Sequence, residues 1–118
     1  MKTKKILLVD DDVFARGVMQ KILQSWNYEV YSCSRGEQAL DKLQQVFFNI
    51  LITDFRMPEM DGLELIRGAR IIQPGIHAIL VTGSPIEETR CKTDEEKPSG
   101  FLLKPINWDE LKALLATL

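Results

Sequence analysis

Four short apolar runs in the chain are each followed by polar residues that could take part in chemistry. Asp10 and Asp11 follow the first run, Asp54 the second after one further residue, Thr82 the third and Lys104 the fourth. Continuous apolar runs of this kind are typical of strands buried on both faces of a parallel sheet. The carboxyl ends of parallel strands meet at one edge, where ligands bind in open α/β sheets. We therefore expect three carboxylates, a hydroxyl and an ammonium to converge on one crevice.

Three neighbouring carboxylates repel one another unless positive charge lies among them. Two like charges about 4 Å apart cost roughly 4 kcal/mol at an effective dielectric near 20. Lys104 supplies one positive charge, and a hard divalent cation would supply the rest. An all-oxygen site made of a few carboxylates and waters suits Mg²⁺, with Mn²⁺ as a substitute.

Each of these residues also has a simpler interpretation when it is taken alone. Asp12 directly precedes Val13 and could cap a helix, as could the two aspartates before it. Asp54 could be a loop carboxylate, Thr82 a turn residue and Lys104 a solvated charge. The position that they share at the ends of apolar runs favours a common site over these separate roles.

The strands that position these residues can be placed from the apolar runs. Buried strands are predicted at 6–9, 50–52, 79–81 and 101–103, and the β-prone segment 28–32 predicts a fifth, less buried strand at an edge. Helical spacing of apolar residues fills the intervals between the strands. Strand and helix alternate, which predicts an α/β three-layer sandwich of right-handed βαβ units.

The face that the first helix turns to the core is predicted from residues that recur every fourth position. This stripe contains Phe14, Val18, Ile22 and Trp26.

The interval between the last two buried strands fits a helix less well. It reads SPIEETRCKTDEEKPS, in which Ile86 and Cys91 are almost the only residues suited to a core. Pro98 further limits any helix there. We expect a short helix over 85–92 followed by an exposed loop, and a full-length amphipathic helix is the alternative.

The composition is that of one globular domain. The 118 residues are 45% hydrophobic and 27% charged, so we expect a single domain over 1–118 with its own core. A net charge of −2 argues against direct nucleic-acid binding, which needs a concentrated basic surface. The apolar runs are too short for a signal sequence or a membrane span, and a cytoplasmic location is expected.

The motifs at the ends of the runs resemble those of response-regulator receiver domains. LLVDDD, ITDFRMPEMDGLEL, VTGS and FLLKP stand in the order and approximate spacing of that family, and the resemblance covers nearly the whole chain. Its most specific parts are D-x-x-M-P-x-M-D-G at 54–62 and the Lys104-Pro105 pair. The resemblance implies a flavodoxin-like fold with five parallel strands in the order 2-1-3-4-5 and helices on both faces. The fourth helix is expected to be short or irregular from the residues of its own interval.

The resemblance also implies a phosphoacceptor and a metal site. Asp54 would receive the phosphoryl group as an acyl phosphate, since a carboxylate is a competent nucleophile toward phosphorus. Asp10 and Asp11 would hold Mg²⁺ together with Asp54 and the backbone carbonyl of Arg56.

Further residues take a role in switching by the same resemblance. Thr82 and Lys104 would contact the phosphoryl group, and Phe101 would be the aromatic switch that enters the space left by a moving Thr82. Arg56 and Ser84 occupy positions that influence how long the acyl phosphate survives. The side chain of Arg56 could shield that group from water or point to solvent.

The implied function is that of a signalling module. A sensor histidine kinase or phosphotransfer protein would phosphorylate it, and the domain would catalyse only its own phosphorylation and dephosphorylation. An effector domain or a second copy could dock on the face formed by the fourth helix, fifth strand and fifth helix.

Two other functions are weighed against this one. A small Mg²⁺-dependent phosphatase or phosphotransferase with an aspartyl intermediate usually has an acid/base Asp two residues after the nucleophile, where this chain has Arg56. A pseudo-receiver that only binds partners is expected to lack a site residue, and none is missing here.

Overall fold

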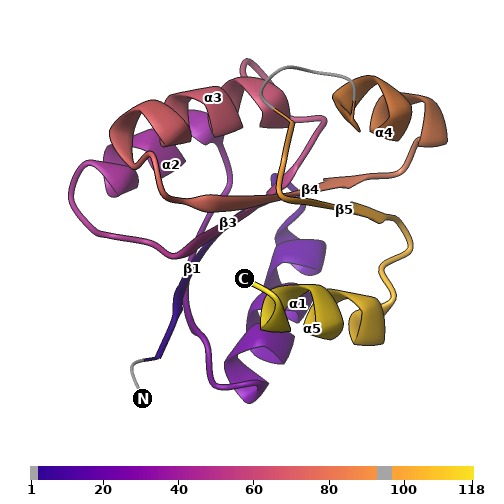
Figure 1. The fold of residues 1–118 in the computed structure, drawn as a ribbon, viewed down its shortest axis with the longest axis horizontal. Coiled ribbons are helices and arrows are strands. Elements are labelled where there is room, and N and C mark those ends of the chain that lie inside the picture. Colours follow the sequence, from indigo (N-terminus) through magenta and orange to yellow (C-terminus); the bar gives the residue numbers. More distant parts are fainter. Residues whose placement is uncertain (1–2, 93–96) are drawn as a thin grey trace.

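The computed structural model describes residues 3–92 and 97–118 of the chain, in which strands and helices alternate (Figure 1). The elements are β1 (Lys5–Val9), α1 (Val13–Ser25), β2 (Glu29–Cys33), α2 (Gly36–Leu43), β3 (Ile50–Asp54), α3 (Gly62–Ile72), β4 (His77–Thr82), α4 (Pro85–Lys92), β5 (Gly100–Leu103) and α5 (Trp108–Ala116). None of the helices in the described part of the chain has the length and apolar character to cross a bilayer.

The five strands form one parallel sheet in the order β2-β1-β3-β4-β5. The predicted fold and strand order are therefore confirmed, and the weakly apolar segment predicted at an edge is the edge strand β2. Successive strands are added to the sheet in opposite directions on the two sides of the β1–β3 pair, in which Val9 lies opposite Thr53. That reversal creates a crevice at the carboxyl edge, the general position of ligand sites in this kind of sheet.

Helices cover both faces of the sheet, as Figure 1 shows: α2, α3 and α4 lie on one side and α1 and α5 on the other. Each side has its own apolar core. Phe48, Leu51 and Ile66 are fully buried on the α2–α4 side, and Leu8, Leu23 and Leu111 are buried on the α1–α5 side. This arrangement is the predicted three-layer sandwich.

Polar side chains fix where several helices begin. Asp12 caps α1, because its Oδ1 accepts from the amides of Phe14 and Ala15 at 2.9 and 3.2 Å. Of the two interpretations of Asp12, the capping role is the one that the structure shows. Asp61 caps α3 in a reciprocal capping box with Glu64, a pairing that satisfies two otherwise free amides.

The predicted core face of α1 was partly wrong: Trp26 packs half-buried against the core, but the start of the stripe does not. Phe14 and Val18 are 83% and 52% exposed, whereas Met19 and Leu23 are buried. Both rows have the spacing of one helix face, and they lie one residue apart, which is a rotation of about 100°. The row that contains Met19 packs against the sheet, so the start of α1 carries exposed apolar side chains.

The short fourth helix is confirmed, since α4 has eight residues. The expectation for its core was partly wrong: Cys91 is buried, but Ile86 is 83% exposed and Glu87 is buried instead. The exposed loop expected after α4 falls mainly on residues 93–96, which lie outside the described part of the chain.

Candidate functional site

Three carboxylates meet at the carboxyl edge of β1 and β3. Asp10 and Asp11 follow β1 and Asp54 ends β3, and one carboxylate oxygen from each lies within 4.8 Å of the other two. Asp10 and Asp54 are only 4% and 7% exposed, whereas Asp11 is exposed. Closely spaced carboxylate oxygens are hard ligands of the kind that Mg²⁺ takes, so these residues fit a divalent ion.

The side chain and the backbone carbonyl of Asp10 each accept a hydrogen bond. Its Oδ1 accepts a hydrogen bond from the Asp12 amide at 2.9 Å, and its carbonyl oxygen accepts one from Arg16 Nη1 at 2.8 Å. The side chain is therefore turned into the crevice by its own loop and by the second turn of α1.

Lys104 reaches into the crevice from the loop after β5. Its Nζ lies 2.9 Å from Asp54 Oδ1 and 3.1 Å from Oδ2, and the bond to Pro105 is cis. Burial of the ammonium opposes its charged form, but the hydrogen bond and charge of Asp54 outweigh this and raise the pKa of Lys104. Lys104 therefore stays cationic at the acidic end of the crevice.

Asp54 is an unusual carboxyl group even with this partner. Its burial and the neighbouring carboxyl of Asp10 raise its pKa to about 7, against the lowering effect of Lys104. Burial and Asp10 together thus outweigh Lys104. A divalent cation between the three carboxylates would favour the ionised form.

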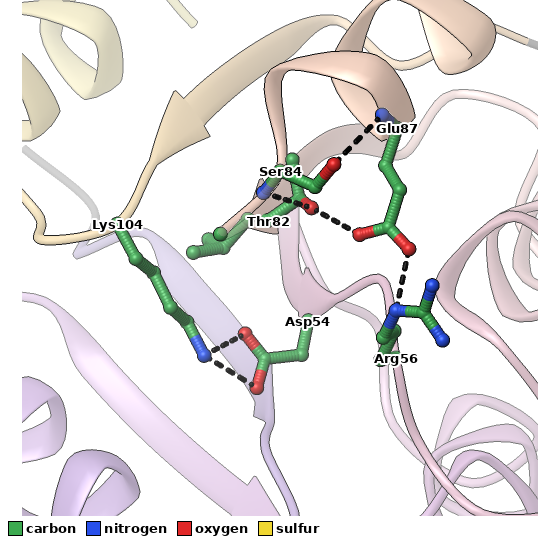
Figure 2. A pocket seen from close by; sticks show the side chains of 8 residues that line it. Asp54, Arg56, Thr82, Ser84, Glu87 and Lys104 are labelled. Atoms are coloured by element: carbon green, nitrogen blue, oxygen red, sulfur yellow. Dashed lines mark hydrogen bonds and ion pairs between the residues drawn. The ribbon is translucent and has the colours of Figure 1, made fainter.

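Thr82 ends β4 and faces Glu87, a residue of α4 that sequence reasoning missed. Thr82 Oγ1 donates to Glu87 Oε1 at 2.8 Å, and Glu87 Oε2 lies 2.5 Å from Arg56 Nε (Figure 2). We call these two contacts the Glu87 bridge. Its three residues line one side of a pocket of about 310 Å³ that Asp54 and Lys104 also line.

A sequence signal for Glu87 existed. Cys91 is the apolar residue of α4 suited to the core, and Glu87 stands four positions before it. Residues four apart share a helix face, so a buried Cys91 turns Glu87 inward too.

Of the remaining predicted residues, Ser84 and Arg56 line the same pocket, and Phe101 lies outside its lining. Ser84 directly precedes α4: its amide donates to Thr82 Oγ1 at 3.2 Å, and its Oγ accepts from the Glu87 amide at 3.3 Å. The Arg56 side chain is 83% exposed yet reaches the pocket through Glu87. Phe101 packs half-buried against the core on the α4 side, where Lys92 Nζ lies 5.4 Å from its ring centroid.

The model of the response regulator receiver domain matches residues 6–116. This chain belongs to that family. The receiver protein CpdR of Brucella abortus is 35% identical over 108 residues, which cover 92% of this chain and 90% of CpdR. The transcriptional regulatory protein ZraR of Escherichia coli K12 is 32% identical over 110 residues, which cover 93% of this chain and 25% of ZraR. The chain thus spans about a quarter of the length of ZraR.

Solved receiver structures match over the full fold. Chemotaxis response regulator CheY4 of Vibrio cholerae superposes with a TM-score of 0.88 at 30% identity, covering 99% of this chain and 100% of CheY4. The receiver domain of the Pseudomonas aeruginosa sensor histidine kinase PA1611 has a TM-score of 0.87 at 25% identity, covering 98% and 97% of the two chains. That structure is described with a magnesium ion coordinated in its active-site cleft.

This receiver domain also has an apolar groove that leads to the site. A hollow of about 380 Å³ between α1 and the start of α5 is lined by Phe14, Val18 and Trp108, and it reaches Asp54 and Lys104. The groove exists because the first turns of α1 expose an apolar row. A protein that seats on this groove lies directly beside Asp54.

Proposed function

We propose that this receiver domain accepts a phosphoryl group on Asp54 in a Mg²⁺-dependent reaction and answers with a change of its output surface. The observation that carries the proposal is the arrangement around Asp54. Asp54 is a buried carboxylate that shares a crevice with Asp10 and Asp11 and is contacted through both oxygens by Lys104.

The reaction is an attack by one Asp54 carboxylate oxygen on phosphorus. A new O–P bond forms, the bond from phosphorus to the donor breaks, and the donor leaves with its electron pair. Because the pKa of Asp54 is about 7 even with Lys104 beside it, a bound cation would help to keep it ionised for this attack. Lys104 then remains to bind the phosphoryl oxygens by a charge-assisted hydrogen bond.

Asp10, Asp11, Asp54 and the backbone carbonyl of Arg56 are the proposed ligands of Mg²⁺, with Mn²⁺ as a substitute. When bound, the ion supplies positive charge for the phosphoryl oxygens. The close approach of the three carboxylates supports this assignment, and so does the magnesium described in the cleft of the PA1611 receiver.

Four further residues are proposed to act after transfer. The Thr82 hydroxyl would bind the new phosphoryl group, and Phe101 would move into the space that Thr82 leaves. Arg56 and Ser84 are proposed to tune the lifetime of the acyl phosphate, because both line the pocket beside Asp54.

The phosphodonor is proposed to be a sensor histidine kinase or a phosphotransfer protein that docks in the apolar groove between α1 and α5. A donor must bring its phosphoryl group to Asp54, and the groove leads there. The output partner is proposed to be an effector domain or a second copy on the α4–β5–α5 face, without direct nucleic-acid binding.

We propose that residues 1–118 form one receiver domain and that it works in the cytoplasm. We propose that it catalyses only its own phosphorylation and dephosphorylation and has no substrate of its own.

The test is phosphoryl uptake by the purified domain. Incubation with acetyl phosphate and Mg²⁺ should add one phosphoryl group to the intact mass, and Asp54→Asn should add none. The matched control is Asp41→Asn, an exposed aspartate of α2, which should behave as the parent does. Equal uptake by Asp54→Asn would refute the assignment of Asp54.

A further inference from the structure

Glu87 places a carboxylate in the pocket that adjoins Asp54. The side chain comes from the first turn of α4 and is only 8% exposed as a residue. Figure 2 shows its carboxylate between Thr82 and Arg56, while the Asp54 carboxylate points to Lys104. A negative group therefore already lies on one side of the space that a phosphoryl group on Asp54 would enter.

The hydrogen bond from Thr82 to Glu87 uses the only hydrogen of the Thr82 hydroxyl. A threonine hydroxyl has one hydrogen to give, and Thr82 gives it to Glu87 Oε1 at 2.8 Å. The same oxygen of Thr82 accepts from the Ser84 amide at 3.2 Å. In this state the hydroxyl cannot also donate to an oxygen on Asp54, so a phosphoryl group must compete with Glu87 for it.

The contact with Arg56 links Glu87 to the second loop of the site. Arg56 follows β3 by two residues, and its Nε lies 2.5 Å from Glu87 Oε2. The Glu87 bridge thus connects the loop that follows the phosphoacceptor, the end of β4 and the start of α4. Apart from Glu87, Cys91 is the buried residue among the α4 side chains that the structure describes.

We propose that Glu87 is an internal competitor of the phosphoryl group, and that phosphorylation of Asp54 displaces it and frees the first turn of α4. The proposal rests on the proposed function, since it requires a phosphoryl group on Asp54. A phosphoryl group carries close to two negative charges, so it repels the Glu87 carboxylate. It also offers oxygens to which Thr82 can donate instead.

This role makes Glu87 a positioning residue, because it acts through Thr82 and Arg56. In the unmodified domain it turns the Thr82 hydroxyl toward α4 and fixes α4 to the sheet. In the phosphorylated domain its release passes the event at Asp54 to the surface that α4 helps to form. The ligand affinity of the site and the order of α4 are then set by one side chain.

The first arm of the test measures competition. The probe is beryllofluoride with Mg²⁺, an analogue of the phosphoryl group on a carboxylate, titrated while amide spectra are recorded. Glu87→Gln preserves the side-chain shape and removes the charge, and it should bind the probe about tenfold more tightly than the parent. Glu88→Gln makes the same change one residue away, where the carboxylate pairs with Lys92, and it should stay within about twofold.

The second arm measures amide hydrogen exchange in α4 and needs no phosphorylation. Without the probe, Glu87→Ala should exchange α4 amides several-fold faster than the parent. With the probe, the exchange rate of the α4 amides in the parent should rise toward that of Glu87→Ala, and the rate in Glu87→Ala should change little. Glu87→Gln, which keeps an acceptor for Thr82, should lie between the two.

The outcomes separate this inference from the proposed function. If the parent binds the probe but Glu87→Gln has the affinity of Glu88→Gln, Glu87 is not a competitor. If Glu87→Ala exchanges α4 as the parent does without the probe, the bridge does not hold α4. If the parent fails to bind the probe at all, the proposed phosphoacceptor site is wrong, and this inference falls with it.

Discussion

Helices α3 and α4 lie on the same face of the sheet, but they are held in place by different forces. Helix α3 buries Leu63, Leu65 and Ile66 and starts with a capping box. The shorter α4 has only Glu87 and Cys91 buried among its described side chains. Burial of apolar side chains anchors α3, whereas polar contacts that pass through the site contribute much of what anchors α4.

The difference explains which region can respond to chemistry at Asp54. The apolar contacts of α3 are expected to change little when a charge appears on Asp54, because the hydrophobic effect does not depend on charge. The contacts of Glu87 with Thr82 and Arg56 are expected to change, since both are electrostatic and face the pocket. A responsive helix beside a fixed one is what a two-state surface needs.

The largest expected effect compares a buried leucine of α3 with an exposed isoleucine of α4. Leu65→Ala should lower the free energy of unfolding by about 2 to 5 kcal/mol, because it removes a fully buried side chain. Ile86→Ala should change it by less than about 0.5 kcal/mol, since Ile86 is 83% exposed. Urea unfolding followed by circular dichroism measures both, and similar losses in the two variants would contradict the contrast.

The next effect is a pH dependence of the free energy of unfolding that comes from Asp54. The pKa of Asp54 is raised to about 7 from an ordinary 3.8, so between these values the folded domain holds a proton that the unfolded chain releases. In the metal-free domain this group therefore stabilises the fold below about pH 4, and that contribution is lost as the pH rises to 7. Relative to Asp54→Asn, the loss should be roughly 2 kcal/mol, after allowance for solvent screening.

Mg²⁺ gives this measurement its control. Because the metal binds the ionised carboxylate, its stabilising effect should grow from pH 5 to pH 8. Leu65→Ala should keep the same pH dependence as the parent, because it does not touch the site. An identical slope in the parent and in Asp54→Asn would show that Asp54 is not the titrating group.

The smallest effect compares how the two helices begin. Asp61→Ala removes the cap of α3 and should cost about 1 kcal/mol of global stability. Ser84→Ala removes the weaker 3.3 Å contact to the Glu87 amide and should cost less than half as much. Thermal unfolding ranks the two variants, and a larger loss for Ser84→Ala would mean that α4 is better anchored than its burial indicates.

The sequence was sufficient for the sheet and for the residues gathered at its edge. Continuous apolar runs leave little choice other than buried parallel strands, and residues that follow such runs must fall at one edge. The structure accordingly brings Asp10, Asp11 and Asp54 together and puts Lys104 on Asp54. Their chemical roles, and those of Arg56, remain predictions.

The orientation of two helices was missed, although in α4 the spacing between Glu87 and Cys91 carried a signal. In α1 two adjacent rows are both apolar, and helical spacing alone does not say which row meets the sheet. In α4 a buried acid lies within a run of charged residues, where solvent exposure is the usual outcome. Glu87 is buried because Thr82 and Arg56 supply its partners, and those partners come from other elements.

The three consecutive aspartates after β1 have identical side chains but different tasks. Asp10 is turned inward, Asp11 contributes a carboxylate at the rim, and Asp12 starts α1. The connection between Val9 and Val13 has just these three residues, so none of them is spare. Deleting any one of them would leave two aspartates to serve three positions and would also rephase α1 against the sheet. A length change here should therefore be far more harmful than the loss of a single charge.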